Sequence, residues 1–546
     1  MGVRFKHWQA RSSAKPSHYA GLVELIHSNR QFTAIPQLAY GDYGLEKIIA
    51  TLRSAIANNK RIALYADYDV DGTMSCVSWI WFLKSIGFHN FVHYIPNRFS
   101  EGYGVNLKAV QYLVSQQKAE VIITMDTGIT ANMEAEWCRH HGVDFICTDH
   151  HVIQLEKMPD CLILNPKMHP DPLYQELCGC GITFVLLRQL GKFFSPPASL
   201  WQDILALTGM ATICDVVPLN GVNHKLAQFG VQALLTSKRP VLQELLRAAS
   251  LGGSELDEKD IGFRLGPRIN AVGRLEHADK VVRAFIEEDP RELVEFMHVC
   301  NEKRKTIQAK IVEEARVAAR QYADDGILFL GGQWHQGVVG IAASKIAEEF
   351  WKPVWLFNRL EGRCVGSARS IANFNVTEAM VKAGAYFEKF GGHHAAGGFS
   401  FHPDNEGAIR ETLLAYADEQ RALYPERWES TIAYDCALSL DLVDLALCEH
   451  LQGLRPFGNS FAEPVFCLEV AIENSVFYND QKTGQAKHTA VHFKDGRRRS
   501  QKIMFFNQVH RELAAGVQAR ILVTANKNVW RGNTSLSLQG CDFALS

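Results

Sequence analysis

Four short apolar runs in the first half of the chain are each followed at once by an aspartate. The runs cover residues 61–66, 121–125, 143–148 and 210–214. Their length and their content of Val, Ile and Leu predict buried strands. The longer stretches between them, at residues 75–86, 106–117 and 132–141, predict helices. Strands that alternate with helices predict an open parallel α/β sheet, which binds ligands beyond the carboxyl ends of its strands.

The polar residues after these runs are carboxylates and imidazoles. They are Asp67, Asp69, Asp71, Asp126, Asp149, His150, His151 and Asp215. If the chain stays extended past the first run, alternate side chains share a face, so the first three aspartates point into one cleft. Crowded carboxylates need cations to neutralise them. Oxygen ligands with one or two imidazoles favour Mn²⁺ or Mg²⁺, and a bridging carboxylate can hold two ions roughly 3.5–4 Å apart.

Three other interpretations of these residues are weaker. The run Asp67 to Gly72 matches the opening of an EF-hand loop, but Ser78 stands where that loop needs a glutamate. Any single aspartate could instead be a helix N-cap or a turn residue, although four such positions with two adjacent histidines are harder to explain in this way. No P-loop or Rossmann glycine motif follows the runs.

Composition describes the class of the protein. The 546 residues are 47% hydrophobic and 21% charged, which is typical of a globular protein of about three domains. No apolar run reaches the roughly 18–20 residues needed to span a membrane, and residues 1–16 lack the apolar core of a secretory signal. The thirteen cysteines are scattered and lie mostly in apolar runs. We therefore expect free thiols, no membrane association and a cytoplasmic location.

The middle of the chain predicts a long helix and a second α/β region. Residues 291–324 contain no Gly or Pro and predict one helix of roughly 50 Å. Apolar runs at 327–330 and 353–357 predict further strands. The polar segments 366–370 and 391–398 are rich in Gly, Ser, Arg and His and predict loops that approach an anion.

The C-terminal part predicts a small β-barrel with a basic surface. Short alternating runs at 465–472, 487–493, 502–506, 519–525 and 534–538 predict five strands, as in an OB-fold. Between residues 482 and 531 basic residues greatly outnumber the two acidic ones, Asp495 and Glu512. Such a stripe can follow a phosphate backbone, and aromatic residues there can stack on bases. The candidate groove residues are Arg497, Arg498, Arg499, Lys502 and Trp530.

At the level of motifs, the chain resembles the DHH phosphoesterase superfamily, named for the triplet seen here as Asp149-His150-His151. Within it, the chain is similar to the bacterial RecJ-type single-stranded-DNA exonucleases. The resemblance covers roughly residues 60–546 and includes all four aspartate motifs. It also includes the segments 96–104, 266–275, 334–340, 366–370, 391–398 and 456–459.

The resemblance implies an α/β architecture around a central groove. Its parts are a parallel-sheet DHH domain at 1–285, a linking helix at 286–325, a DHHA1 domain at 326–410, a connecting segment at 411–464 and an OB-like barrel at 465–546. It implies 5′→3′ hydrolysis of single-stranded DNA with two Mn²⁺ or Mg²⁺ ions, releasing 5′-nucleotides in DNA repair and recombination. A single-strand-binding protein or a helicase is an expected partner, and a monomer is the expected state.

The resemblance also implies roles for individual residues. Asp69, Asp71, Asp126, His150 and Asp215 are the expected metal ligands, with Asp126 as the bridge, and Asp67 and His151 support catalysis. Arg98, Ser367 and Arg369 are expected to bind substrate phosphate, and Arg268 and His393 to lie along the groove.

Two alternatives remain open. One is a DHH/DHHA1 phosphodiesterase that cleaves short oligoribonucleotides or cyclic dinucleotides, although such enzymes usually lack the C-terminal OB-like part. The other is a non-catalytic DNA-binding replication scaffold, in which Asp69, Asp71 or Asp126 is expected to be lost; all three are present.

Overall fold

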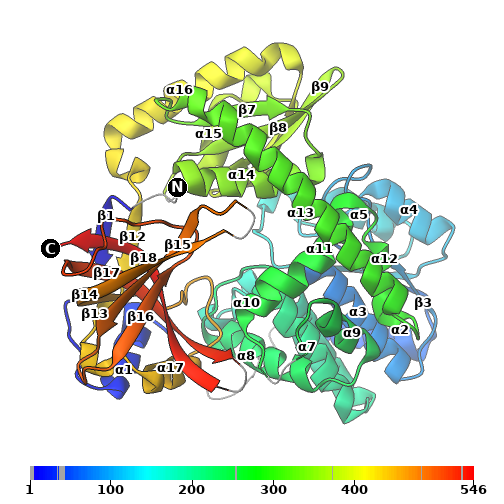
Figure 1. Ribbon diagram of the computed structural model, residues 1–546. Helices are drawn as coiled ribbons and strands as arrows, with labels where there is room; N and C mark the ends of the chain where they lie inside the picture. Colours follow the sequence, from blue (N-terminus) through cyan, green and yellow to red (C-terminus); the bar gives the residue numbers. More distant parts are fainter. Residues whose placement is uncertain are drawn as a thin grey trace. The chain divides into compact units, whose positions relative to one another are not determined.

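The protein divides into two compact units. The computed structural model describes residues 5–33, 35, 44–252, 255–371, 373–480, 483–530 and 533–546 (Figure 1). The first unit contains residues 30–302 and 455–462, and the second contains residues 1–29, 303–454 and 463–546. The division falls inside the long helix α13 (Arg291–Ala319), which is followed by a short 3₁₀ turn at Arg320–Tyr322. The predicted long helix is therefore present, a few residues shorter than expected.

The first unit is built on a five-stranded parallel sheet. In spatial order the strands are β3 (Phe91–Tyr94), β2 (Ile62–Ala66), β4 (Val121–Met125), β5 (Asp144–Thr148) and β6 (Leu162–Leu164). All four pairings are parallel. This is the predicted parallel sheet, and it brings the carboxyl ends of β2, β4 and β5 side by side.

Helices cover both faces of this sheet. The helices of this unit, some of which pack on the sheet and others on those helices, are α2 (Leu45–Ala57), α3 (Val70–Ser85), α4 (Leu107–Ser115), α5 (Asn132–His140), α6 (Gly179–Leu190), α7 (Ala198–Cys214), α8 (Gly221–Thr236), α9 (Pro240–Ala248), α10 (Glu258–Asp260), α11 (Gly266–Leu275) and α12 (Asp279–Ile286). Alternate residues of β2 enter different cores: Ile62 and Leu64 pack with α3, α6 and α7, and Ala63 and Tyr65 pack with α4 and α5. Burial on both faces explains why β2 is a continuous apolar run.

Two expectations about this unit are wrong in detail. Residues 210–214 are the last turn of the helix α7, so Asp215 follows a helix and not a strand. Because α7 is buried along most of its length, it shows no helical alternation of apolar and polar residues. The chain is also not extended through Asp67 to Asp71, because α3 begins at Val70. These carboxylates approach one another through a strand-to-helix turn.

The second unit contains a mixed sheet that corresponds to the second predicted α/β region. Its strands are ordered β10 (Lys389–His393), β11 (Ala396–Phe401), β9 (Arg363–Arg369), β8 (Val354–Leu360) and β7 (Leu328–Gly332), and only β7 and β8 are parallel. Helices α14 (Gln336–Phe350), α15 (Val376–Lys382) and α16 (Glu406–Leu423) accompany it. The segments 366–370 and 391–398 were predicted as loops, but they lie largely in β9 and in the β10–β11 hairpin. The prediction was wrong because their glycines have no side chains to show the alternation of a strand.

The same unit contains a closed five-stranded barrel. The strands β14 (Phe466–Asn479), β15 (Ala486–Lys494), β16 (Ser500–Phe505), β18 (Asn533–Leu545) and β17 (Gln518–Trp530) pair in this order, and β17 pairs back with β14. The predicted OB-like barrel is therefore present. The short strand β13 (Cys436–Ala437) pairs with β14 and so extends the sheet of the barrel. Helix α17 (Leu445–Gln452) lies between β13 and β14 in the chain.

The N-terminal segment belongs to the second unit, a placement that the sequence did not indicate. Strand β1 (His7–Ala10) pairs in parallel with β12 (Thr431–Tyr434), and Trp8 donates to Asp542 at 2.7 Å. Helix α1 (Tyr19–Asn29) follows, and the Tyr19 hydroxyl donates to Asp444 at 2.6 Å. These contacts join residues more than 400 positions apart, so no local pattern encodes them.

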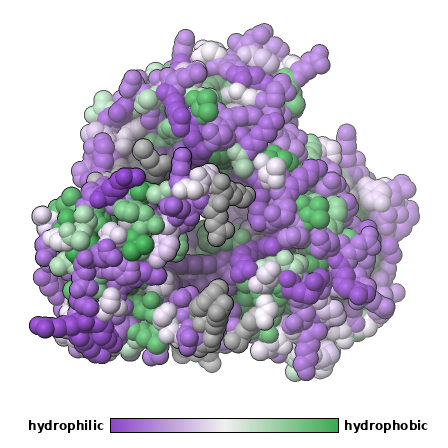
Figure 2. Space-filling model, viewed as in Figure 1, coloured by the Kyte–Doolittle hydropathy of each residue, from purple (hydrophilic) through white to green (hydrophobic). Residues whose placement is uncertain are grey.

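The surface and the cysteines agree with the composition. The face drawn in Figure 2 is largely hydrophilic, with hydrophobic side chains in separate patches. All thirteen cysteines are free, and ten of them are buried. Of the helices in the described ranges, none combines the length and apolar character required to cross a membrane.

Candidate functional site

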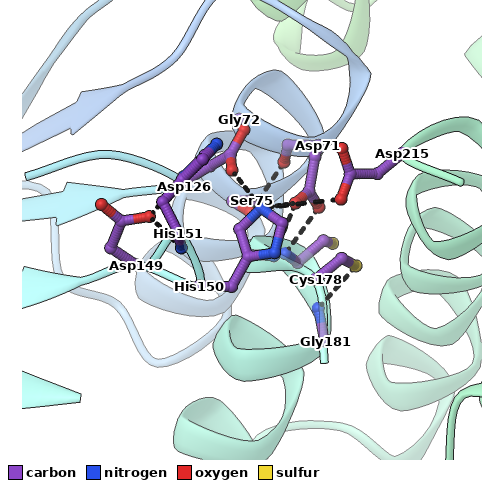
Figure 3. Close-up of polar contacts among 12 residues, drawn as sticks. Asp71, Gly72, Ser75, Asp126, Asp149, His150, His151, Cys178, Gly181 and Asp215 are labelled. Carbon is purple, nitrogen blue, oxygen red and sulfur yellow. Dashed lines mark hydrogen bonds and ion pairs between the residues drawn. The ribbon is translucent and has the colours of Figure 1, made fainter. Parts of the chain in front are cut away.

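The predicted metal-binding side chains gather at one end of the parallel sheet in the first unit (Figure 3). Within the part of the chain that is described, they form three overlapping groups in which one ligand atom from each residue lies within 4.8 Å of the others. The groups are Asp67 with Asp69 and Asp126, Asp71 with His150 and Asp215, and Asp126 with His150 and His151. Every predicted metal ligand is included. Asp126 belongs to two groups, as a bridging carboxylate requires, whereas the single lone pair of His150 Nε2 can serve only one ion.

The turn between β2 and α3 orients the first carboxylates. Asp69 caps α3, and its Oδ1 accepts from the backbone amides of Asp71 at 2.8 Å and Gly72 at 3.1 Å. Asp69 is therefore a helix N-cap, the role that the sequence left open for any single aspartate. It also belongs to the carboxylate cluster. A Cβ at Gly72 would lie 2.4 Å from the Asp67 carbonyl oxygen, so only glycine fits this turn.

The N-terminus of α6 holds Asp71. The carboxylate accepts from the backbone amides of Gly179 at 2.5 Å and Cys180 at 2.7 Å. A Cβ at Gly179 would lie 2.7 Å from the Asp126 Cβ, so the absence of a side chain lets the helix end approach both carboxylates. Helix N-termini stabilise negative charge, and this one faces the most buried carboxylate of the cluster.

Asp126 and His150 form the centre of the cluster. Asp126 follows β4 with a φ of 59°, a left-handed conformation that is strained for a residue with a side chain. Its Oδ1 lies 3.1 Å from the His150 Nε2. The same Nε2 lies 3.5 Å from Asp215 and 3.9 Å from Asp71. One imidazole nitrogen thus faces three carboxylates.

His151 is oriented by groups on both sides of its ring. Its Nδ1 lies 2.7 Å from Asp149 Oδ1, and its Nε2 lies 2.9 Å from the Tyr103 hydroxyl. Burial alone would raise the pKa of Asp149, but the hydrogen bond and charge of His151 outweigh burial and lower that pKa. Burial would lower the pKa of His151, and Asp149 raises it instead. This carboxylate–histidine pair is the arrangement that fixes a ring near a metal.

Burial and the charge of neighbouring carboxylates raise the pKa values of four aspartates of the cluster, Asp67, Asp71, Asp126 and Asp215. Burial, then the charge of Asp71, raises the pKa of Asp126 well above its usual range. Burial, then the charge of Asp69, raises the pKa of Asp71 to about 6, and burial with Asp71 raises that of Asp215 to about 9. The buried Asp67 Oδ1 receives no hydrogen bond from the described residues. The site therefore contains several buried carboxylates and few positive charges to balance them. Carboxylate oxygens with one or two imidazoles are ligands that fit Mn²⁺ or Mg²⁺.

A cavity of about 290 Å³ opens beside Asp67 and Asp69. Arg98, from the loop after β3, lines it with its guanidinium 5.0 Å from the ring of Tyr68. Asn270 and Arg274 of α11 line it too, and Asn270 accepts from the Val70 amide at 3.1 Å. The predicted substrate contact Arg98 is therefore beside the carboxylate cluster.

Arg268, predicted to lie along the groove, is only 7% exposed. Its guanidinium donates to the carbonyl oxygens of Arg264 at 2.5 Å and Ala248 at 3.3 Å. It therefore supports the packing of the first unit, and Arg274 is the arginine of α11 that lines the cavity. The spacing of residues along α11 could have predicted which arginine lines the cavity. Asn270, Gly273 and Arg274 are at positions i, i+3 and i+4 and share one face of the helix, whereas Arg268 lies on the opposite face.

In the second unit, Ser367 and Arg369 lie on β9 against the start of α14. A Cβ at Gly340 of α14 would lie 3.0 Å from both the Ser367 Oγ and an Arg369 guanidinium nitrogen. Arg369 Nε donates to Ser344 at 3.1 Å. His393 is exposed on β10 and aligns through Ala396 with Arg369, two strands away. A hydroxyl, a guanidinium and a helix N-terminus at one place can bind a phosphate.

The basic residues of the barrel are less free than the local sequence suggests. Arg497 and Arg499 lie 3.4 and 3.8 Å from Asp444, and Arg499 also contacts Asp495 at 2.7 Å. Arg498 and Lys502 are exposed. Phe493 and Phe505 are fully buried and cannot stack on bases, whereas Phe506 is 47% exposed. The side chain of Trp530 lies outside the described residues.

Some residues of the site were not predicted. The amides of Gly179 and Cys180 lie in the Cys-Gly-Cys segment, which the sequence presents only as a pair of thiols. Asp149 and Tyr103 were parts of recognised motifs, but their contacts with His151 depend on three-dimensional geometry. A glycine just before an apolar run is a signal for a helix N-terminus that approaches another group closely.

Comparison with protein-family models defines the class. Residues 61–212 match the DHH family N-terminal domain, residues 321–419 match the DHHA1 domain, and residues 434–542 match the RecJ OB domain. With the parallel sheet and its carboxylate cluster, these matches describe a DHH-type phosphoesterase. The OB match begins at residue 434, in β12, upstream of the expected start at 465.

Similar proteins then give the family. Over 449 residues the chain is 31% identical to the single-stranded-DNA-specific exonuclease RecJ of Dickeya dadantii, covering 78% of this chain and 77% of that protein. It is 32% identical to RecJ of Bacillus subtilis over 454 residues, which is 81% of this chain but 56% of the relative's length. The crystal structure of RecJ in complex with Mn²⁺ from Thermus thermophilus matches with a TM-score of 0.83 at 26% identity, covering 98% of this chain and 79% of that one. The chain belongs to the RecJ family of single-stranded-DNA-specific exonucleases.

Proposed function

We propose that this protein hydrolyses single-stranded DNA from its 5′ end and releases 5′-nucleotides, using two divalent cations, Mn²⁺ or Mg²⁺. The observation that carries the proposal is the overlap of the donor groups at the carboxylate of Asp126, which belongs to two of them. Shared ligands hold two ions close enough to act on one phosphate. Family membership supplies the substrate class.

The ligands divide between two neighbouring positions. Asp71, His150 and Asp215 would hold one ion, Asp67 and Asp69 would hold the other, and Asp126 would contribute to both. When bound, such ions lower the pKa of water and neutralise charge that develops on a phosphate. The α6 amides hold Asp71 in place, and Asp149 fixes the ring of His151, so that the cluster is preorganised.

Cationic side chains in each unit provide phosphate contacts. In the first unit, Arg98 and Arg274 line the cavity next to Asp67 and Asp69, where a substrate phosphate can reach the cluster. In the second unit, Ser367, Arg369 and the start of α14 form the proposed binding site for the 5′ phosphate, with His393 on the same sheet face. Binding of the terminal phosphate at a fixed place would set the polarity of the reaction.

The barrel is proposed to hold the strand farther from the cut. OB-type barrels bind single strands through cationic and aromatic residues. Arg498, Lys502 and Phe506 are exposed and suit this role, whereas Arg497 and Arg499 already contact carboxylates. A single-strand-binding protein or helicase as partner, a monomeric state and a cytoplasmic location stay predictions.

The test is degradation of defined polymers. The protein with Mn²⁺ should shorten a 3′-labelled, 5′-phosphorylated single strand of DNA stepwise from its 5′ end. A duplex and an RNA of the same sequence serve as comparisons. Cleavage confined to short RNA or cyclic dinucleotides would replace the proposal with an oligonucleotide phosphodiesterase, and tight binding without cleavage would indicate a scaffold.

A further inference from the structure

The carboxylate of Asp215 is held differently from that of Asp71. Asp71 accepts hydrogen bonds from two backbone amides of α6. Within the described ranges of the chain, the Asp215 carboxylate has a polar contact with the His150 Nε2 alone, at 3.5 Å (Figure 3). Its side chain is also 22% exposed, so tight packing does not fix it. The position of this carboxylate therefore depends on the backbone at the end of α7.

The residue after Asp215 has a strained backbone. Val216 has a φ of 58°, in the left-handed region, where a β-branched side chain is a genuine outlier. Its side chain is 62% exposed, so burial of that side chain does not explain the conformation. Such a conformation persists only where surrounding groups impose it. A contact with another part of the chain must therefore hold Val216 in this state.

The segment 455–462 makes that contact. The side-chain amide of Asn459 donates from Nδ2 to the carbonyl oxygen of Val216 at 2.8 Å. The backbone amide of Leu219 donates in turn to the carbonyl oxygen of Asn459, also at 2.8 Å. These two hydrogen bonds join Asn459 to both ends of the turn that follows Asp215.

The segment is itself firmly anchored in the first unit. Phe461 is 1% exposed, and its ring centroid lies 4.5 Å from that of Phe32. The Gly458 amide donates to the Phe461 carbonyl oxygen at 2.9 Å, which closes a tight turn around Asn459. A Cβ at Gly458 would lie 2.7 Å from the Leu219 Cδ1, so the glycine permits this close approach. The segment belongs to the first unit, although α17 and β14, which flank it in the chain, belong to the second.

We propose that Asn459 is a positioning residue for Asp215. Its hydrogen bond holds Val216 in the left-handed conformation and so keeps the Asp215 carboxylate turned toward His150. Without the bond, Val216 relaxes to an ordinary negative φ, and the peptide group that it shares with Asp215 rotates. The inference rests on the proposed metal site, and it gives the motif at residues 456–459 a role in the reaction.

A purely structural role for Asn459 is the alternative. Asn459 would then only attach the segment to the first unit, and its loss would lower stability without a specific effect on metal binding. Asn459→Ala keeps the backbone bond to Leu219 and the packing of Phe461, so the segment stays attached in this variant. Val216→Gly separates the two roles, because glycine adopts the left-handed conformation without strain and does not need the bond.

Isothermal titration with Mn²⁺ in the absence of DNA tests the inference. Asn459→Ala should weaken one of the two Mn²⁺ sites by roughly tenfold or more, as is seen when a group that orients a ligand is lost. The same substitution should have little effect in a protein that carries Val216→Gly. The melting temperature of metal-free Asn459→Ala should fall no further than that of a control variant.

Asn90→Ala is the matched control. Asn90 Nδ2 donates at 2.7 Å to the carbonyl oxygen of Asn59, whose φ of 49° is also left-handed. Both residues precede the amino ends of β2 and β3, at the opposite end of the sheet from the carboxylate cluster. Equal Mn²⁺ affinity of Asn459→Ala and Asn90→Ala would overturn the inference, and so would an equal loss with and without Val216→Gly. If the wild type itself bound no Mn²⁺, the proposed function would fail together with the inference.

Discussion

Asp126 combines a strained backbone, complete burial and shared membership of two donor groups. A protein maintains such a residue only if the surroundings force it, and strain of this kind concentrates at functional sites. The structure thus explains in physical terms why the aspartate after β4 is the proposed bridge.

Replacing Asp126 separates catalysis from folding. Asp126→Asn should lower the rate of hydrolysis by at least roughly 10³-fold, because a bridging ligand acts on both ions. The melting temperature without metal should be unchanged or higher, because a buried carboxylate beside other carboxylates is removed. Rates of single-strand degradation and thermal melts in a chelator measure the two effects.

The exposed Asp160→Asn is a suitable control, since the side chain of Asp160 is 86% exposed and pairs with the surface residue Arg139. It should leave both quantities near wild type. A hydrolysis rate for Asp126→Asn equal to that of the control would remove the bridging assignment.

The raised pKa values predict how stability depends on pH. In the metal-free protein, the pKa of Asp71 is raised to about 6 and that of Asp215 to about 9 by burial and neighbouring charge. The folded state then binds more protons than the unfolded state between pH 4 and 9, so the free energy of unfolding falls as pH rises in this range. With saturating Mn²⁺ the fall should disappear or reverse, because cations compete with protons for these carboxylates.

Melting temperatures at pH 6 and pH 8, each with a chelator or with Mn²⁺, check this dependence. The metal-induced increase in melting temperature should be larger at pH 8. An equal increase at both pH values would show that these carboxylates are ionised in the metal-free protein.

At the scale of elements, the approach of α6 to the end of the sheet controls the site. The helix end donates two amides to Asp71 and leaves no room for a side chain at Gly179. Gly179→Ala should therefore weaken Mn²⁺ binding by about 10–100-fold, the range seen when a group that orients a ligand is disturbed.

Gly407→Ala is the matched control, because Gly407 lies in a helix where an added Cβ would meet nothing within 4 Å beyond the backbone of its own helix. It should keep wild-type affinity for Mn²⁺ in isothermal titration. If Gly179→Ala binds Mn²⁺ as tightly as this control, the close packing of α6 is not important for the site.

The elements also show which features sequence can predict. The strands β2, β4 and β5 were predictable because burial on both faces leaves uninterrupted apolar runs that end at polar residues. Helix α7 was not distinguishable from a strand at residues 210–214, since its burial removes helical periodicity. The strands around Ser367 and His393 were obscured by glycines, which have no side-chain pattern.

At the scale of the whole molecule, the proposed reaction uses residues of both units. The carboxylate cluster belongs to the first unit, and the Ser367 and Arg369 site belongs to the second. The placement of β1 and α1 against the second unit shows the limit of sequence interpretation. It depends on contacts such as Trp8 with Asp542, for which the chain contains no local signal.

Arg369 provides a test of the contribution of the second unit. Arg369→Ala should reduce the rate on 5′-phosphorylated ends by roughly tenfold or more and change the rate on 5′-hydroxyl ends less, because a guanidinium–phosphate contact is lost. Total affinity for a long single strand should change little. Equal losses on both kinds of end, measured under single-turnover conditions, would contradict the assignment of the 5′ phosphate to this place.

The central claim is that one carboxylate cluster holds two cations through shared ligands. Electron paramagnetic resonance of Mn²⁺ bound to the purified protein tests it most directly. We predict two ions per chain with a spectrum of magnetically coupled Mn²⁺, and loss of the coupling in Asp126→Asn. A single ion per chain, or two uncoupled ions that are unaffected by Asp126→Asn, would contradict the account.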